Sequence, residues 1–330
     1  MFGRINGVIF VVLLFITSYL GCIFLLFPVV PFLFLAPSLW RKCADSLVGY
    51  WLTFPAFSNE LTKILDWLFL FNVLYKIDPL LLTTEKISLK APLKRIPGAG
   101  WAMSAGSYIF LERSFERDKT NMAEIIEYYK KSGNIYQLLL FPEGTDRGVR
   151  AAAQSEAFAK KNGLCVYDYV LHPRITGFNY LLNLMRQQNY ISYIYDITLA
   201  YEDVIIDSEM TLLKEGVFPK NVHFDIKRYN IDEIPTDPQQ SGKWLTDLWQ
   251  GKEKKLKDLY SMVKTQGIGY YLTAALWITK SAVWLYLMYL YNSVRIYVLF
   301  VSLFYMVVLR HYNGLEFLAI KWFRSKRKSV

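Results

Sequence analysis

Residues 5–40 contain no charged side chain, and this run constrains the fold of the chain more than any other feature. As one straight helix it would be roughly 54 Å long, far more than the ~30 Å hydrocarbon core of a bilayer requires. Pro28, Pro31 and Pro37 would interrupt such a helix. We therefore predict one membrane crossing near residues 7–27, followed by a kinked extension or a re-entrant hairpin. The length of the apolar stretch and the lack of a small-residue cleavage site disfavour a cleaved signal peptide.

A second apolar region lies near the C-terminus, where Lys280 and Arg295 separate three uncharged stretches. Each stretch has 14 or 15 residues and is too short to span a bilayer alone. A crossing here must accommodate a cation by snorkelling or by placing it at a turn. One crossing, two crossings and a surface-lying helix are all compatible with this pattern. We predict an N-terminal membrane anchor over residues 1–50, a domain that carries the chemistry over 51–264, and C-terminal membrane segments with a basic tail over 265–330.

The positive charge of the chain is concentrated beside these apolar regions. The formal net charge of the 330 residues is +10, but residues 85–264 hold 25 Lys/Arg and 23 Asp/Glu. The basic excess in the flanks suits the anionic headgroups of a lipid bilayer better than nucleic acid, for which no binding motif is present. The cysteines are Cys22, Cys43 and Cys165, without a CxxC pair, so neither a disulfide framework nor a metal site is expected.

The middle of the chain has the pattern of a mixed α/β domain. Polar-faced helices are predicted over residues 122–131 and 243–264, and strands over 137–141, 194–201 and 222–229. Pro235, Pro238 and Gly242 predict a loop before the second helix.

The strand predicted at 137–141 leads into residues 141–148, FPEGTDRG. A buried strand, a Pro/Gly turn and charges of both signs follow one another here. Such a turn can present backbone N–H groups and the Arg147 guanidinium to a phosphate, with a carboxylate beside them for hydroxyls. An ordinary strand end with a solvated turn would have the same residue types, so the pattern alone leaves both interpretations open.

Three further segments surround this turn. Residues 93–101 (LKRIPGAGW) lead into 106–113 (GSYIFLER), an apolar, glycine-punctuated stretch that ends in a cation. Residues 170–178 (VLHPRITGF) follow the turn, and residues 65–70 (LDWLFL) precede all of these. In this order the segments resemble the motifs of the lysophosphatidic acid acyltransferase family, and within it the lysocardiolipin/lysophosphatidylinositol acyltransferase branch. The resemblance covers about residues 61–325.

The resemblance implies an α/β, glycerol-phosphate acyltransferase-like fold, with a mixed sheet flanked by helices and with N- and C-terminal membrane helices. It also implies transfer of an acyl chain from acyl-CoA to the hydroxyl of a lysophospholipid, with no metal and no cofactor beyond acyl-CoA as co-substrate. Lysophosphatidylinositol, lysocardiolipin and lysophosphatidic acid are the acceptors of this family.

The family's second, third and fourth motifs can be carried over residue by residue. The second motif ends in an arginine, which corresponds to Arg113. The third corresponds to residues 141–145, in which Glu143, Gly144 and Thr145 are expected at the acceptor's glycerol phosphate, with Arg147 as a further cation inferred from its charge. The fourth is centred on Pro173, and His172 beside it is expected to have a positioning or a packing role.

The first motif departs from the family pattern. In the family it is Asn-His, four residues, Asp, and the histidine is the base that deprotonates the acceptor hydroxyl. If Asp66 is the motif aspartate, the histidine position is Leu61, preceded by Glu60. Only 15 residues separate Tyr50 from Asp66, so a missing segment is a simpler explanation than a point substitution. Asp66 is then a remnant of the motif or only a residue at the start of a helix.

No other histidine is an obvious replacement for the missing base. His223 falls on a predicted strand and His311 follows the last apolar segment. Two functions therefore remain: an acyltransferase, or a non-catalytic lipid-binding or regulatory form that pairs with an active paralogue. Lys326 and Lys328 stand at the third and fifth positions from the end, as in dilysine retrieval signals. They predict an integral endoplasmic reticulum membrane protein with a cytosolic C-terminus, and a basic tail on anionic lipid is the alternative.

Overall fold

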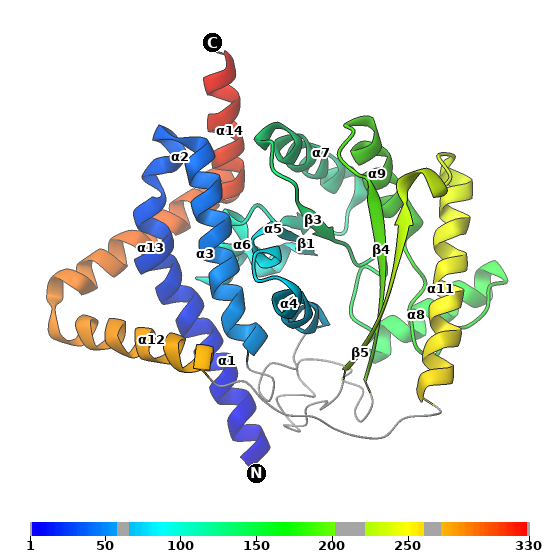
Figure 1. The fold of residues 1–330 in the computed structure, drawn as a ribbon, viewed down its shortest axis with the longest axis horizontal. Coiled ribbons are helices and arrows are strands. Elements are labelled where there is room, and N and C mark those ends of the chain that lie inside the picture. The colour runs from blue at the N-terminus through cyan, green and yellow to red at the C-terminus, as the bar shows by residue number, and fades with distance from the viewer. Residues whose placement is uncertain (1, 58–65, 202–221, 261–271, 329–330) are drawn as a thin grey trace. The chain divides into compact units, whose positions relative to one another are not determined.

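The computed structural model describes residues 2–57, 66–201, 222–260 and 272–328, which divide into two compact units. We call residues 8–62, 67–140 and 269–330 the anchor unit, and residues 1–7, 63–66 and 141–268 the hairpin unit. Each unit contains a small sheet of its own (Figure 1). Both units combine separate stretches of sequence, and the predicted functional boundaries near residues 50 and 264 stay predictions.

The N-terminal apolar run forms a kinked helix that then reverses direction. Helix α1 (Phe2–Gly21) continues through a π-helical turn, η1 (Cys22–Leu26), and a 3₁₀ turn, η2 (Phe27–Val29), into α2 (Pro31–Leu35). Helix α3 (Pro37–Phe57) then runs back beside them (Figure 1). Each proline occupies one of the first two positions of its own segment, where the missing N–H costs nothing. The predicted interruption of the helix by the prolines is confirmed. The helix is kinked and the chain also reverses direction, so both predicted alternatives occur.

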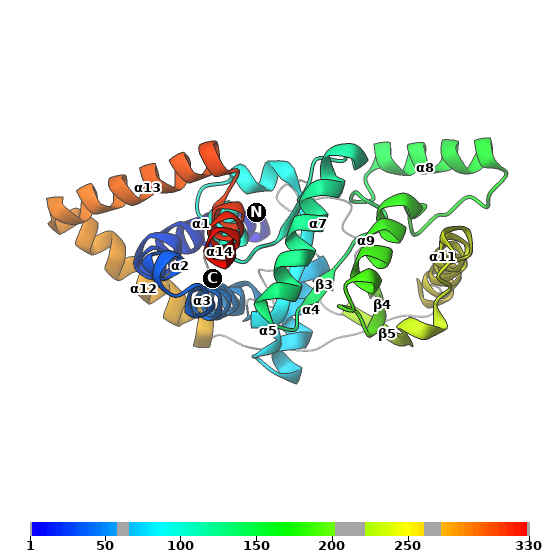
Figure 2. The ribbon, with the colours of Figure 1, turned by 90° about the horizontal axis from the view of Figure 1, so that it is seen from above.

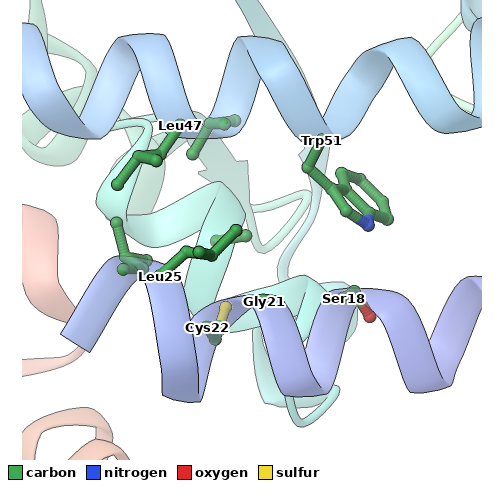
Figure 3. Close-up of a pocket in the computed structure, with 9 residues that line it drawn as sticks. Ser18, Gly21, Cys22, Leu25, Leu47 and Trp51 are labelled. Atoms are coloured by element: carbon green, nitrogen blue, oxygen red, sulfur yellow. The ribbon is translucent and has the colours of Figure 1, made fainter. Parts of the chain in front are cut away.

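The kinked N-terminal helix and α3 pack closely against each other. In Figure 3, Cys22 and Leu25 of η1 face Leu47 on α3, and the cavity left among the lining side chains is only about 20 Å³. By length and composition the stretch Val12–Leu35 is apolar enough to cross a membrane, as is a C-terminal helix, Asn292–Tyr312.

A three-stranded parallel sheet forms the centre of the anchor unit. Helices α4 (Asp66–Ile77) and α5 (Leu81–Thr84) lead into strand β1 (Glu85–Lys90). The 3₁₀ turn η3 (Ala91–Arg95) and α6 (Ala99–Ala105) connect β1 to β2 (Ile109–Leu111), and α7 (Phe115–Ser132) connects β2 to β3 (Gln137–Leu139). The order is β2-β1-β3, with Leu89 opposite Phe110 and Lys86 opposite Leu138. The predicted helix over 122–131 and strand from 137 are confirmed.

Buried charges join helix α3 to this sheet. The Asp45 carboxylate of α3 lies 2.5 Å from Arg41 and 2.7 Å from Lys86 of β1. Burial alone would raise the pKa of Asp45, but these two cations hold it below its usual range. Arg41 also donates to the Ser107 hydroxyl and the Ala105 carbonyl, each at 2.6 Å. Every charge in the cluster therefore has a partner, which is what makes its burial tolerable.

The C-terminal helices pack on the same unit. They are α12 (Leu272–Leu290), α13 (Asn292–Tyr312) and α14 (Leu315–Lys328), and Figure 2 shows α12 and α13 diverging from the point where they join. Lys280 lies inside α12 and donates to the Tyr50 hydroxyl at 2.6 Å, whereas Arg295 lies in the first turn of α13. Tyr305 of α13 stacks on Trp101 of α6, with ring centroids 4.6 Å apart.

The hairpin unit is built on two long antiparallel strands, β4 (Tyr193–Tyr201) and β5 (Val222–Asn230), paired from Tyr193↔Asn230 to Tyr201↔Val222. Its other elements are α8 (Val149–Asn162), α9 (Ile175–Gln187), the 3₁₀ turn η4 (Ile231–Glu233) and α11 (Pro238–Tyr260). Both strands confirm the prediction. The prediction of one mixed sheet is only partly correct, because the described residues form a parallel sheet and a separate antiparallel pair.

One predicted loop is wrong. Helix α11 begins at Pro238, so Gly242 is helical. The Asp237 carboxylate accepts hydrogen bonds from the backbone N–H groups of Gln239 and Gln240, at 3.0 and 2.9 Å. Proline in the first turn and an aspartate before it are helix-starting signals, and together they outweigh the loop tendency of a single glycine.

Candidate functional site

The turn at residues 141–148 is held against the segment that precedes α9. The Gly144 backbone N–H donates to the Phe141 carbonyl at 3.0 Å, and the Arg174 N–H donates to the Pro142 carbonyl at 2.7 Å. Gly144 has a φ of +71°, and a Cβ at this position would lie 3.0 Å from the Arg174 side chain. Glycine is favoured here because other residues rarely adopt this φ, and a side chain would also require Arg174 to move. The third and fourth motifs of the sequence therefore form one packed structure.

Glu143 is engaged by the protein itself. One carboxylate oxygen accepts a hydrogen bond from the Leu171 backbone N–H, and the other accepts one from the Trp249 indole, both at 3.2 Å. A carboxylate held between a loop and a helix fixes the shape of the turn that carries it. The assignment of Glu143 to the substrate stays a prediction, and the geometry adds an orienting role for the same group.

Arg147 is held in place by a chain of hydrogen bonds that starts at Glu253 of α11. Both Glu253 carboxylate oxygens accept backbone hydrogen bonds from Asp168, Tyr169 and Val170, at 2.7 to 3.1 Å. The Asp168 carbonyl in turn accepts a hydrogen bond from Arg147. Within the described residues the buried Arg147 Nε has no hydrogen-bond partner. Thr145, two positions earlier, is half-exposed.

His172 is a packed residue with a fixed orientation. Its Nδ1 lies 2.9 Å from the Ser155 hydroxyl, and the same hydroxyl accepts a hydrogen bond from the His172 backbone N–H at 3.0 Å. The ring stacks on Tyr167 with centroids 4.2 Å apart, and burial lowers the pKa of the imidazole, which favours the neutral form. Pro173 beside it is buried. This geometry suits the positioning or packing role expected from the sequence.

Arg113 lies in the anchor unit, two residues after β2. It is exposed and has a φ of +63°, an unfavourable conformation for a residue with a Cβ. The Asp118 carboxylate holds the backbone in this state by accepting hydrogen bonds from the N–H groups of Glu112 and Ser114, at 2.8 and 3.1 Å. A strained conformation that is held by a buried carboxylate is typical of functional positions. Asp118 thus positions the arginine that ends the second motif.

The first-motif region lies largely outside the described residues. Asp66 is the first residue of α4, and Leu61 lies outside the described residues. His223 on β5 and His311 at the end of α13 are exposed. In the part of the chain that the structure describes, no group of three His, Cys, Asp or Glu side chains has the arrangement of a metal site.

Several residues that hold the candidate site in place could not be identified from the sequence. Arg174 is visible within the LHPR segment, but its contact with Gly144 is not. Asp118, Trp249 and Glu253 carry no local motif, because their partners lie between 4 and 106 positions away along the chain.

Comparison with known proteins gives consistent matches. A family model described as acyltransferase matches residues 62–200, and one described as acyltransferase C-terminus matches residues 212–266. Lysocardiolipin acyltransferase 1 of Mus musculus is 33% identical, with 98% of this chain and 96% of that protein aligned. The chain belongs to the acyltransferase family. Lysocardiolipin acyltransferase 1 of Gallus gallus is 39% identical over 77% of this chain and 73% of that protein.

A further relative is lysophosphatidylinositol acyltransferase 10 of Caenorhabditis elegans, which is 44% identical over 67% of this acyltransferase chain and 63% of its own length. The chain thus spans less than two thirds of that protein. These relatives place the chain in the lysocardiolipin/lysophosphatidylinositol branch. No solved structure matches the chain significantly.

The comparisons also bear on the first motif of this acyltransferase. The family match begins at residue 62, one position after Leu61. The alignment with the mouse relative extends over 372 positions, more than the 330 residues of this chain, so it contains gaps in this chain. Both observations are consistent with a segment that relatives possess and this chain lacks.

Proposed function

We propose that the protein acts in acyl-CoA-dependent transfer of an acyl chain to a lysophospholipid in phospholipid remodelling. Lysophosphatidylinositol, lysocardiolipin and lysophosphatidic acid are the acceptor classes. The observation that carries the proposal is the packed pair of motifs around Gly144 and Arg174 within a chain of this family. The names of the relatives support the acceptor classes, because they are lysophosphatidylinositol and lysocardiolipin acyltransferases.

We assign the acceptor phosphate to Gly144, Thr145 and Arg147 of the hairpin unit, with Glu143 orienting the turn. For Arg113 of the anchor unit, the motif resemblance alone supports a phosphate-binding role. Guanidinium groups and backbone N–H groups are the usual protein donors to phosphate. Two observations support these assignments: Arg113 is strained and exposed, and Arg147 is half-exposed on the same turn as the half-exposed Thr145.

The reaction itself requires a proton acceptor. The acceptor hydroxyl oxygen attacks the thioester carbonyl, an ester bond forms, the C–S bond breaks, and CoA leaves as the thiol. In the family the first-motif histidine takes the hydroxyl proton, and Leu61 cannot do so. The Nδ1 atom of His172 is engaged by Ser155, and its Nε2 atom is buried from solvent, so it is not a ready substitute.

The absence of the histidine favours a second candidate function. A chain with the acceptor-binding motifs but without the base would bind lysophospholipid or acyl-CoA without turnover, and would act as a regulatory partner of an active paralogue. In either case we propose an integral protein of the endoplasmic reticulum membrane, anchored through Val12–Leu35 and α13, with the basic C-terminus in the cytosol.

An acyl-transfer assay distinguishes the two functions. The chain is expressed in microsomes that lack endogenous lysophospholipid acyltransferases and is supplied with labelled oleoyl-CoA and each acceptor class in turn. A form with the Asn-His segment restored between Tyr50 and Asp66 is assayed in parallel. Product from both forms supports an active enzyme with another base. Product from the restored form alone supports the non-catalytic function, and product from neither contradicts acyl transfer to these acceptors.

A further inference from the structure

A cavity of about 440 Å³ lies in the anchor unit, beside the second-motif segments 93–101 and 106–113. It is enclosed by η3, the end of β2, α7, the last turns of α13 and the start of α14. Neither Arg113 nor any residue of the 141–148 turn lines it. The cavity therefore borders the second-motif segments without including Arg113, and its wall combines elements that are more than 200 positions apart in sequence.

Two cations at the cavity have no ion-pair partner among the described residues. Arg95 and Arg310 both line it and both are exposed, yet no described carboxylate pairs with either. The third cation of the wall, Lys94, is already neutralised by Glu316. The one lining carboxylate, Glu112, accepts a hydrogen bond from Arg117 at 2.8 Å. The cavity thus carries a positive charge that the protein does not compensate.

The rest of the wall is amphipathic. Phe110 and Ile125 are buried at its inner side, and the amides of Asn121 and Asn313 provide hydrogen-bonding groups. An apolar strip leaves the cavity along α13. It consists of Met306, Leu303 and Leu299, which lie on one helical face and are 50%, 57% and 64% exposed.

This combination matches one chemistry. Guanidinium groups bind phosphate, often in bidentate fashion, and an exposed apolar strip on a membrane helix accepts an acyl chain. Helix α13 is one of the two stretches that are long and apolar enough to cross a bilayer, so its last turn, with Arg310, falls where headgroups lie. A soluble phosphate would make no use of the strip.

We infer that this cavity binds an anionic phospholipid of the bilayer, with the phosphate at Arg95 and Arg310 and one acyl chain along Leu299, Leu303 and Met306. The site goes beyond the proposed acyl transfer, because its ligand is a resident lipid and not the acceptor. Occupancy would connect α13 and α14 to η3 and α7 through the lipid.

The test is retention of lipid by the full-length protein. The protein is purified in mild detergent from membranes that contain phosphatidylcholine and phosphatidylinositol, and the lipid retained per protein is measured by mass spectrometry. No acyl-CoA is present, so the outcome does not depend on catalysis. We expect selective retention of phosphatidylinositol, and at least about a tenfold loss in the double variant Arg95→Ala/Arg310→Ala, because both cations that attract the anionic headgroup are removed.

Three further variants and one competing ligand keep the inference falsifiable. Arg295→Ala removes the same charge at the other end of α13 and should leave retention unchanged; an equal loss would mean unspecific attraction and overturn the site. Met306→Trp fills the cavity without changing its charge and should also lower retention several-fold. Unchanged retention in Met306→Trp would show that lipid does not enter the cavity.

Glycerol phosphate at millimolar concentration should not displace the lipid, and displacement would overturn the role of the acyl chain. Arg95→Lys/Arg310→Lys should retain most of the lipid, which separates charge from misfolding.

Discussion

Glu143 accepts a hydrogen bond of 3.2 Å from the indole of Trp249, a residue 106 positions further along the chain. The bond connects the centre of the turn at residues 141–148 to α11. Since the other Glu143 oxygen accepts from Leu171, the carboxylate clamps the turn between two elements of the hairpin unit. The shape of the turn therefore depends on a helix that contains none of the family motifs.

Trp249→Phe should loosen this turn. The change retains an aromatic ring but removes the donor, at a cost of about 1–3 kcal/mol for a bond to a charged group. We expect a lower melting temperature and weaker binding of lysophosphatidylinositol to the purified protein. Trp244→Phe on the same helix is the matched control, because its indole donates no hydrogen bond within the described structure. Equal effects of the two substitutions would assign the loss to ring packing.

Asp118→Asn should disturb the presentation of Arg113. The carboxylate accepts from the N–H groups on both sides of this strained residue, and the amide keeps the shape but loses the charge. Charge-assisted hydrogen bonds of this kind contribute about 1.5–3 kcal/mol, so acceptor affinity should fall roughly tenfold. Calorimetry with lysophosphatidylinositol measures the change. Glu116→Gln in the same helical turn should bind like the unmodified protein, and an unaltered affinity in Asp118→Asn would remove the positioning role.

Local sequence patterns predicted the secondary structure well. The strands at 137, 194 and 222 and the helix over 122–131 appear where alternation and amphipathic spacing place them. These signals are local, because the spacing at which side chains return to the same face of a helix or strand depends only on backbone geometry. The helix start at Pro238 is the exception, where the sequence reading favoured a loop through Gly242 although Asp237 and Pro238 provide the stronger helix-starting signal.

The organisation of the site could be predicted only in part. The motifs identify Arg113, Glu143 and Gly144, but the groups that hold them come from elsewhere in the chain. Glu253 supports Arg147 through a loop that lies 83 to 85 positions before it. The cavity at Arg95 and Arg310 depends on the packing of a C-terminal helix against a turn far earlier in sequence. Long-range pairings of this kind leave no periodic signal.

Stability should depend on pH through Glu85. This carboxyl is 4% exposed on β1, and burial raises its pKa to about 8, against the opposing effect of Lys86. A raised pKa means that the folded protein holds this proton while the unfolded chain, with its pKa near 4.5, releases it. Its stabilising contribution is complete below pH 4.5 and is lost as the pH rises to about 8.

Glu85→Gln tests this dependence. The amide resembles the protonated carboxyl and cannot titrate, so the decline of melting temperature between pH 5 and 8 should become shallower. Lys86, whose pKa burial lowers to about 8, contributes only above this window. Glu156→Gln, at a solvent-exposed pair, serves as the control and should keep the original slope. A slope that Glu85→Gln leaves unchanged would assign the pH dependence to other groups.

Breaking the ion pair between Lys94 and Glu316 should detach α14 from the motif segment. The two side chains are 6% and 0% exposed, so either one alone would be a buried charge without compensation. Lys94→Met or Glu316→Leu should each cost about 3–5 kcal/mol, whereas the double variant should recover most of the loss. Chemical denaturation of the four proteins gives the coupling energy directly.

At the exposed pair of Lys160 and Glu156, Glu156→Ala should cost less than about 1 kcal/mol. If the losses from Lys94→Met and Glu316→Leu simply add, the two residues act independently. A positive coupling would mean that the helix at the C-terminus and the turn after β1 are stabilised as one structure, as the cavity between them requires.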